Sequence, residues 1–542
     1  MHSKKTHWGL WAVVLAVAVV LRFWQISGQI LIDDEWHAVH KLMMSGYKGI
    51  FLSLGHADYS IPLTLLFRWL ADSVGLTVWK MRFLPLLAGV LAVPLLPRLL
   101  GRWLDGRERL LFAALLAVSP LLIHFSRYVR PYSPVILLGF AAVILLWQWW
   151  HGGGHWRAML FSLFTIMAAW LHPLSALFPG AALVWFFAAG LLGWRNRGQI
   201  APLVRLWLLA VVTVGLSCAL LLPPILADSA SLAVKSGMGR IEWSTVAQGW
   251  ELIFGTAGNF MGVFMLLPVV AGAVVLWRRD RLFLLYWLWM TAFAVTVIAL
   301  LAPEWLQNAL VLVRYAVIAQ PFFLALAALG AFALISHVRL AAMRGLLAAG
   351  LVVALFCAGP LPGMYGELNQ FTNGLRYQFD YDFVRSPFHP LYNPLPLPEP
   401  YEMMRDEPGR WEIIEAGWHF EINMTPISEY QRFHQRPVKI GMISGLCTDE
   451  RLEGHQPEGW TWGELNPDSG LDIDLKNFVF LTDVLSGPPA GNRFVVFHRR
   501  PFYDWSRTLP DVQPCIDAFR DRFGEPWRST DDLVVFRILG AG

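Results

Sequence analysis

The stretch YSPVILLGFAAVILLWQWW, residues 132–150, has no charged side chain and is close to the ~20 residues that a helix needs to cross a bilayer. Similar runs recur from Leu10 to Leu351. Of the 542 residues 56% are hydrophobic and only 15% are charged, whereas soluble domains have roughly 25% charged residues. A soluble core cannot absorb so many apolar side chains. The sequence therefore predicts an α-helical polytopic membrane protein.

Hydropathy predicts about eleven crossings. They are residues 8–27, 83–101, 109–126, 132–150, 156–171, 173–193, 203–223, 260–277, 282–302, 314–336 and 341–359. The first run is long and has no convincing small-residue cleavage site, so we expect an uncleaved span and not a signal peptide. We interpret the apolar segment 61–76 as a juxtamembrane or re-entrant helix.

The basic residues between these runs predict the orientation, because cytoplasmic loops carry an excess of Lys and Arg. The clusters are Arg98/Arg102/Arg107/Arg109, Arg195/Arg197/Arg205, Arg278/Arg279/Arg281 and Arg339/Arg344. All of them fall on the side of Lys4 and Lys5 if segment 61–76 does not cross. The N-terminus is then cytoplasmic, and the loops 28–60 and 223–259 and the tail lie outside.

The composition changes after Pro360, where Pro, Asp, Glu and Asn become frequent and no apolar run is long enough to span. We predict a transmembrane domain over residues 1–360 and an extracytoplasmic mixed α/β domain over 361–542. The expected strands are Val438–Ile443, Phe478–Leu481, Phe494–His498 and Leu533–Ile538, and the expected helix is Pro514–Phe523.

Charge and cysteine content exclude some functions. The net charge is only +4, and the basic residues lie in short loops, which does not indicate nucleic-acid binding. The four cysteines have no C-x-x-C spacing and suggest no zinc or redox motif. Cys447 and Cys515 in the tail could form a disulfide on an oxidising face of the membrane.

Three consecutive acids, Asp33, Asp34 and Glu35, follow the first span directly. Carboxylates at a membrane surface are costly to desolvate, and Trp36, Val39, Leu42 and Met43 follow them at helical spacing. One interpretation is helix capping and solvation of an amphipathic helix that lies on the membrane. The other is a catalytic function, which other unusual charges on the same face favour.

Those charges are Arg127 and Arg130 in the segment HFSRYVRPY, residues 124–132, which connects two crossings on the outer side. They break the positive-inside bias and have no acidic residue nearby in sequence. Guanidinium groups bind phosphate oxygens bidentately, which favours an anionic ligand at this turn. The alternative is snorkelling to lipid headgroups.

Other polar residues fall on the predicted outer side. His56, Asp58 and Tyr59 could contact an acceptor, and His56 with Asp58 could ligate a divalent metal ion, although two ligands are a weak metal signal. His172 could line a cavity or be a structural histidine at a helix break. Arg314 could contact a carrier phosphate or anchor its helix at the headgroups.

Over residues 8–340 the chain resembles the GT-C superfamily of membrane glycosyltransferases, in particular the bacterial branch related to protein O-mannosyltransferases and lipid A aminoarabinose transferases. The motifs that carry the resemblance are Asp34-Glu35, the polar element and apolar segment His56 to Leu63, the run with Arg82 and Pro85, Arg130 to Tyr132, His172, and Arg314-Tyr315. This chain has His56-Ala57-Asp58-Tyr59 where many relatives have a Pro-Pro pair, and Asp33 is an additional acid.

The resemblance implies an inverting transfer of a sugar from a polyprenyl-phosphate donor in the membrane lipid to a glycolipid, glycan or protein. Asp34 would be the base, with Asp33 and Glu35 orienting it or the acceptor, while Arg127, Arg130, Tyr132 and Arg314 would bind the donor phosphate. A transporter or flippase of a lipid-linked or anionic substrate is the alternative. It predicts internal repeats and mid-membrane ionisable residues, neither of which is clear. An assembly protein without catalytic activity is a third possibility.

Overall fold

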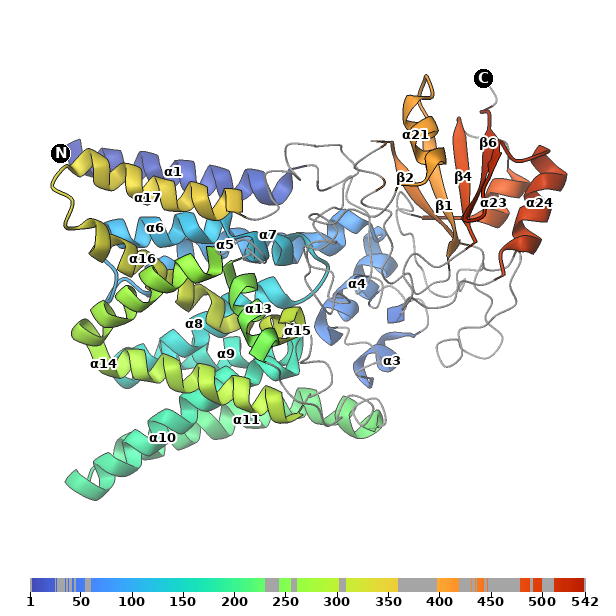
Figure 1. The fold of residues 1–542 in the computed structure, drawn as a ribbon. Coiled ribbons are helices and arrows are strands. Elements are labelled where there is room, and N and C mark those ends of the chain that lie inside the picture. Colours follow the sequence, from blue (N-terminus) through green and yellow to red (C-terminus); the bar gives the residue numbers. More distant parts are fainter. Residues whose placement is uncertain are drawn as a thin grey trace.

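The computed structural model describes residues 2–24, 26, 35, 38, 41, 42, 45–53, 60–229, 243–254, 261–301, 309–358, 397–418, 430, 434, 436–442, 446, 478–487, 491–499 and 511–540. Helices fill the first part of the chain up to Ala358, and a β-sheet occupies the last part (Figure 1). The predicted fold class, a helical membrane protein with a C-terminal mixed α/β region, is confirmed.

Every predicted crossing coincides with helical structure. The helices are α1 (His2–Phe23), α3 (Tyr47–Phe51), α4 (Ile61–Val74), α5 (Val78–Leu99), α6 (Gly106–Val118), α7 (Pro120–Arg127), α8 (Tyr132–Trp150), α9 (His155–Leu171), η3 (Pro173–Ala176), α10 (Leu177–Arg197), α11 (Ala201–Ala227), α13 (Trp243–Phe254), α14 (Met261–Leu301), α15 (Ala309–Tyr315), η5 (Val317–Ala319), α16 (Gln320–Ile335) and α17 (Ala341–Ala358).

Fewer helices than predicted are long and apolar enough to span by themselves. Among the described residues six pass that test, and a bent pair makes a seventh. The difference from about eleven has local causes. The apolar parts of α1 and α17 are short, and α9 has 17 residues. Helix α14 counts once in this test, although it consists of two helical arms that meet at Asp280 and that agree with the two crossings predicted over 260–277 and 282–302.

The bent pair is α6 and α7, which meet at Ser119 at an angle of 56°. The sequence analysis predicted one crossing over 109–126. Pro120 explains the break, because it has no amide hydrogen to donate to the carbonyl of Leu116 and therefore cannot continue α6.

Helix α14 reverses direction at Asp280, whose backbone is non-helical at φ −159° and ψ 84°. The carboxylate of Asp280 accepts the indole N–H of Trp103 at 2.9 Å, and Arg279 donates to both carboxylate oxygens of Glu108 at 2.8 and 2.9 Å. These contacts join the α5–α6 connection to the bend of α14. Both therefore lie at one end of the bundle, which is also the end of the N-terminus in Figure 1. We call it the basic end, since Arg98–Arg109 and Arg278–Arg281 belong to it.

Helix α4 has 14 residues and is about 21 Å long, which is short for a crossing. Arg68 of α4 binds Asp72 one turn later, at 2.9 Å from Nη2, and also donates to the carbonyl of Leu42 at 3.3 Å. In Figure 1, α3 and α4 lie at the end of the bundle opposite the basic end. The short length of α4 and its place at that end of the bundle agree with the predicted juxtamembrane or re-entrant helix.

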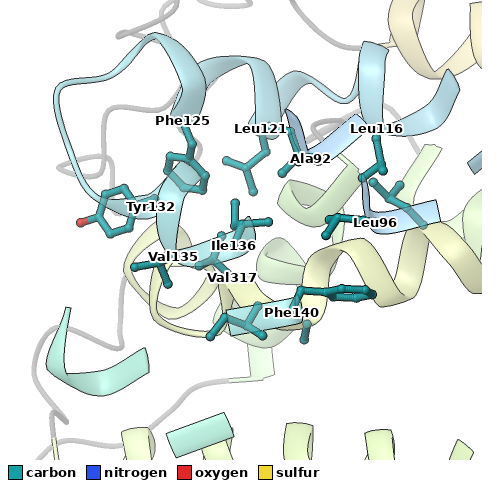
Figure 2. Close-up of a cluster of buried hydrophobic side chains, with 14 of the residues drawn as sticks. Ala92, Leu96, Leu116, Leu121, Phe125, Tyr132, Val135, Ile136, Phe140 and Val317 are labelled. Carbon is teal, nitrogen blue, oxygen red and sulfur yellow. The ribbon is translucent and has the colours of Figure 1, made fainter. Parts of the chain in front are cut away.

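A continuous apolar core joins α5, α6, α7, α8 and η5 below the Arg-rich turn. Leu96, Leu116, Ile136 and Phe140 are almost fully buried in it. Figure 2 shows these side chains, with the ring of Tyr132 at the edge of the cluster and its hydroxyl directed away from the apolar groups. The start of α8 is therefore held firmly by packing on one side.

The C-terminal sheet has the order β3-β2-β1-β4-β6-β5. Strands β3, β2, β1 and β4 are parallel to one another, and β6 is antiparallel to both of its neighbours, β4 and β5. The strands are β1 (Glu412–Trp418), β2 (Val438–Met442), β3 (Phe478–Phe480), β4 (Arg493–His498), β5 (Arg528–Ser529) and β6 (Leu533–Ile538), and the helices are α21 (Glu399–Asp406), α23 (Leu481–Ser486) and α24 (Gln513–Phe523). Apolar side chains from alternate strand positions form two clusters. Helix α21 covers one face of the sheet, and α23 and α24 cover the other (Figure 1).

One buried carboxylate interrupts the apolar face under α21. Glu415 of β1 is fully buried, accepts the hydroxyl of Tyr401 at 2.9 Å and lies 2.6 Å from Nε2 of His498. Buried carboxylates are stable only when they are hydrogen-bonded. Strand β1 was not predicted, because its two acids resemble a loop in the sequence.

Candidate functional site

The acid segment after α1 and the Arg-rich turn after α7 are in direct contact. Glu35 is fully buried, and both of its oxygens lie 3.1 Å from Nη2 of Arg82 on α5. Its Oε1 also accepts the backbone N–H of Val129 at 2.8 Å. Val129 directly precedes Arg130, so Glu35 links the acid segment to the turn predicted to bind phosphate.

These contacts anchor Glu35 to α5 and to the turn after α7, because its oxygens accept from the guanidinium of Arg82 and from the backbone N–H of Val129. The roles predicted for Glu35, as a catalytic acid or as a group that orients the base or the acceptor, stay predictions. Asp33, Asp34, His56, Asp58 and Tyr59 lie outside the described residues, and their predicted roles stay predictions.

Arg127 turns back toward the first helix. Its Nη1 donates to the carbonyls of Trp24 at 2.9 Å and of Leu21 and Arg22 at 3.3 Å. These are carbonyls of the last turn of α1, which lack helical donors. Arg127 thus caps α1, and its predicted contact with the donor phosphate stays a prediction.

Arg130 and Arg314 lie at the two ends of a row of rings. The guanidinium carbon of Arg130 is 5.9 Å from the ring centre of Tyr132, whose ring is 6.0 Å from that of His172. The ring of His172 is 5.3 Å from Tyr315, and the guanidinium carbon of Arg314 lies 5.3 Å over that ring. Four predicted site residues are thereby brought together: Arg130 from the turn before α8, Tyr132 from the start of α8, His172 from the end of α9 and Arg314 from α15.

This row lies at the end of the bundle opposite the basic end. Helix α8 begins at Tyr132, and near its other end Trp147 contacts the rings of Trp103 and Phe283 at the basic end. The 19 residues of α8 span about 28 Å, close to the thickness of a bilayer core.

The two arginines at the ends of this row are both buried. Only 3% of Arg130 and 8% of Arg314 is exposed. Guanidinium groups at a dry boundary bind oxyanions more strongly than they do in water, and their fork shape suits phosphate. The arrangement can hold a phosphate and stabilise negative charge that grows on it.

The structure does not test the predicted metal site, because His56 and Asp58 are among the residues it does not describe. Within the part of the chain that it does describe, no group of three or more His, Cys, Asp or Glu side chains could hold a metal ion.

No role was predicted for Arg82. The signal was present, since a cation four residues into α5 can be buried only if it finds a carboxylate or backbone carbonyls as acceptors. The partner could not be identified, because Glu35 is 47 positions away in the chain.

The comparison with protein families agrees with the resemblance described above over part of the chain. Residues 52–170 match the family model of dolichyl-phosphate-mannose-protein mannosyltransferases. This segment contains Arg82, Arg127, Arg130 and Tyr132. No curated protein sequence matches the chain.

Two solved structures are similar at low identity. The apo crystal structure of ArnT from Cupriavidus metallidurans has a TM-score of 0.47 and 12% identity, with 98% of each chain covered. The oligosaccharyltransferase AglB from Archaeoglobus fulgidus, in complex with an inhibitory peptide and a dolichol-phosphate, has a TM-score of 0.43 and 14% identity over 80% of this chain and 64% of that chain.

Proposed function

We propose that this protein is a glycosyltransferase that moves a sugar from a polyprenyl-phosphate carrier to an extracytoplasmic acceptor with inversion. One observation carries the proposal: Glu35, next to Asp34 in the chain, is bound to the backbone of Val129, next to Arg130. A carboxylate and a buried guanidinium are thereby kept near each other at one end of the bundle. The match of residues 52–170 to mannosyltransferases that use dolichyl-phosphate-mannose supports the same class of donor.

The chemistry needs one base and one group that stabilises an anion. The carboxylate of Asp34 takes the proton of the acceptor hydroxyl while its oxygen bonds to the anomeric carbon. The bond from that carbon to the phosphate oxygen breaks with both electrons on the oxygen. Arg130 and Arg314 stabilise this charge, and attack from the side opposite the phosphate inverts the anomeric centre.

The orientation is part of the proposal, with the basic end in the cytoplasm and the Arg130 end outside. Exposed tryptophans lie near both ends of the bundle, as expected at membrane interfaces: Trp8, Trp156, Trp194 and Trp277 near the basic end, and Trp24, Trp69 and Trp79 near the other. Cys515 of α24 is disulfide-bonded, which suits an oxidising compartment such as the bacterial periplasm. We therefore assign the C-terminal domain to the extracytoplasmic side of the inner membrane.

The acceptor is a hydroxyl-bearing glycolipid, glycan or protein. The family match includes protein acceptors, and the resemblance to aminoarabinose transferases includes glycolipids. Comparing the envelope glycoconjugates of cells with and without the gene by mass spectrometry would identify the acceptor and the sugar.

The variant Asp34→Asn tests the proposal, because the amide keeps the shape of the side chain and cannot take a proton. Purified protein in lipid nanodiscs is incubated with a polyprenyl-phosphate sugar and an envelope extract, and the released polyprenyl phosphate is measured. We expect wild-type protein to release the carrier and the variant to lose at least about 100-fold of that rate, the lower range for a general base. Equal rates would sink the proposal, and transport of the intact donor across vesicles would favour the flippase.

A further inference from the structure

The break between α6 and α7 exposes backbone carbonyls inside the bundle. Pro120 has no N–H for the carbonyl of Leu116, and α6 ends at Val118, so the carbonyls of Leu116 and Ala117 lie in its last turn. A carbonyl without a donor in an apolar interior costs several kcal/mol. These two groups therefore need a donor from another element.

Arg22 of α1 is that donor. Its Nη2 donates to the carbonyl of Leu116 at 3.0 Å, and its Nη1 donates to that of Ala117 at 2.9 Å. Its Nε donates to the hydroxyl of Ser126 on α7 at 3.1 Å. Only 1% of Arg22 is exposed, so one buried guanidinium holds both arms of the bent pair.

The contact is reciprocal. Arg22 of α1 binds α6 and α7, while Arg127 of α7 binds the carbonyl end of α1. We call these two residues the arginine exchange. The guanidinium of Arg22 binds carbonyls at the end of α6, and that of Arg127 binds carbonyls at the end of α1. Together they fix the position of α1 along its axis, and its rotation, relative to α7.

Gly89 of α5 maintains the space for this contact. A Cβ at this position would lie 2.0 Å from the hydroxyl oxygen of Ser126 and 3.0 Å from that of Ser133. A small cavity lined by Arg22, Gly89, Ser126 and Ser133 lies here. A side chain on Gly89 would therefore move the acceptor of Arg22 without touching Arg22 itself.

The arginine exchange lies directly before the acid segment. Arg127 holds the backbone at Trp24, and Glu35 is held at Val129. Trp24 and Glu35, which lie before and after Asp33 and Asp34 in the chain, are thus both held by residues 127–129. We propose that Arg22 is a positioning residue that sets the place of the acid segment relative to Arg130, an inference that rests on the proposed function.

The test compares Arg22→Met with Arg279→Met in nanodiscs. Arg279 is a suitable control, since it also donates to a backbone carbonyl and to a buried partner, but at the basic end. We expect Arg22→Met to lower kcat by about 10- to 100-fold, as a displacement of about 1 Å can, with the KM for the donor within about twofold. Arg279→Met should lower the unfolding temperature and leave kcat of the folded protein unchanged.

Two milder variants and a second readout separate positioning from folding. Ser126→Ala and Gly89→Ala should shift kcat in the same direction as Arg22→Met, and Arg22→Lys should restore part of it. Independently of turnover, hydrogen exchange of residues 24–35 should be faster in Arg22→Met and unchanged in Arg279→Met. Equal kcat losses in Arg22→Met and Arg279→Met would overturn the inference, and so would an unchanged rate of hydrogen exchange in Arg22→Met. If the wild-type protein had no transfer activity but hydrogen exchange changed as expected, only the proposed function would be rejected.

Discussion

Glu35 and Arg82 form an ion pair in which neither side chain is exposed, and Nη2 of Arg82 lies 3.1 Å from both carboxylate oxygens. The pair joins α5 to a residue that follows the first span. Charges this well buried depend on each other, because desolvating either one alone costs several kcal/mol. The pair therefore fixes Glu35, the last of the three acids, to α5 of the bundle.

Arg82→Met should destabilise the protein by about 3 to 5 kcal/mol, since it leaves the carboxylate of Glu35 buried without its cation. The measurement is thermal or denaturant unfolding in a fixed detergent. The double variant Glu35→Gln/Arg82→Met should recover part of the loss, because no charge is then left buried. A double variant less stable than Arg82→Met would contradict this view of the pair.

Arg130→Ala should reduce turnover or donor binding far more than Arg339→Ala, by at least about 10-fold for one charge-assisted bond. Arg339 is an exposed arginine in the connection between α16 and α17 and has the same charge, so it controls for general effects of removing a cation. The measurement is kcat and KM for the polyprenyl-phosphate donor. Similar losses in both variants would remove the argument for a phosphate site at Arg130.

The helices could be predicted from the sequence because their signal is local. An apolar run of about 20 residues has to form a helix in lipid, whatever the rest of the chain does. The strands Val438–Met442 and Leu533–Ile538 were recognised in the same way, from β-branched runs of strand length. Glu412–Trp418 was missed, because Glu415 is stabilised by Tyr401 and His498 and not by anything near it in sequence.

Those parts of the candidate site that have a local signal in the sequence could be predicted, and those that depend on helix packing could not. Arg130 and Arg314 stood out because each is a cation next to an apolar span on the side where cations are rare. Their shared row of rings depends on how α8, α9 and α15 pack, and no local pattern contains that information. Arg22 was overlooked inside the first apolar run, since its partners are carbonyls that only the break at Pro120 makes available.

Gly330→Ala on α16 should destabilise the bundle, because α14 and α16 are in backbone contact there. A Cβ on Gly330 would lie 1.8 Å from the carbonyl oxygen of Pro268, and one on Gly272 would lie 1.9 Å from that of Leu326. Overpacking against backbone cannot be relieved by a rotamer change, so we expect a loss of about 1 to 3 kcal/mol or more. The measurement is the unfolding midpoint in detergent.

Gly215→Ala on α11 is the matched control for Gly330→Ala. No atom lies within 4 Å of the position that its Cβ would take. Alanine should be neutral or slightly stabilising there, because it favours helix over glycine by roughly 1 kcal/mol. If both alanine variants had the same midpoint, the helices could not approach as closely as the structure has them.

The stability of the C-terminal domain should fall when the pH drops below about 6.5, because of His434. Burial lowers the pKa of His434 from 6.5 to about 3, and the charge of Arg436 acts in the same direction. Its Nδ1 accepts the backbone N–H of Arg436 at 3.0 Å, so the neutral ring is the bound form. Above pH 6.5 the ring is neutral in both states. Between 6.5 and about 3 the unfolded chain binds a proton that the folded domain does not, which costs about 2 kcal/mol at pH 5.

His434→Gln removes this titration and keeps an oxygen that can accept the same N–H. The unfolding midpoint of the domain in the full-length protein should therefore drop less between pH 7 and pH 5 in the variant than in the wild type. His337→Gln is the control, since His337 is exposed and lies outside the C-terminal domain, in the connection between α16 and α17. The predicted effect depends on burial of the neutral ring. If the unfolding midpoints of wild type and His434→Gln dropped equally between pH 7 and pH 5, the ring of His434 would be protonated or solvated in the folded domain.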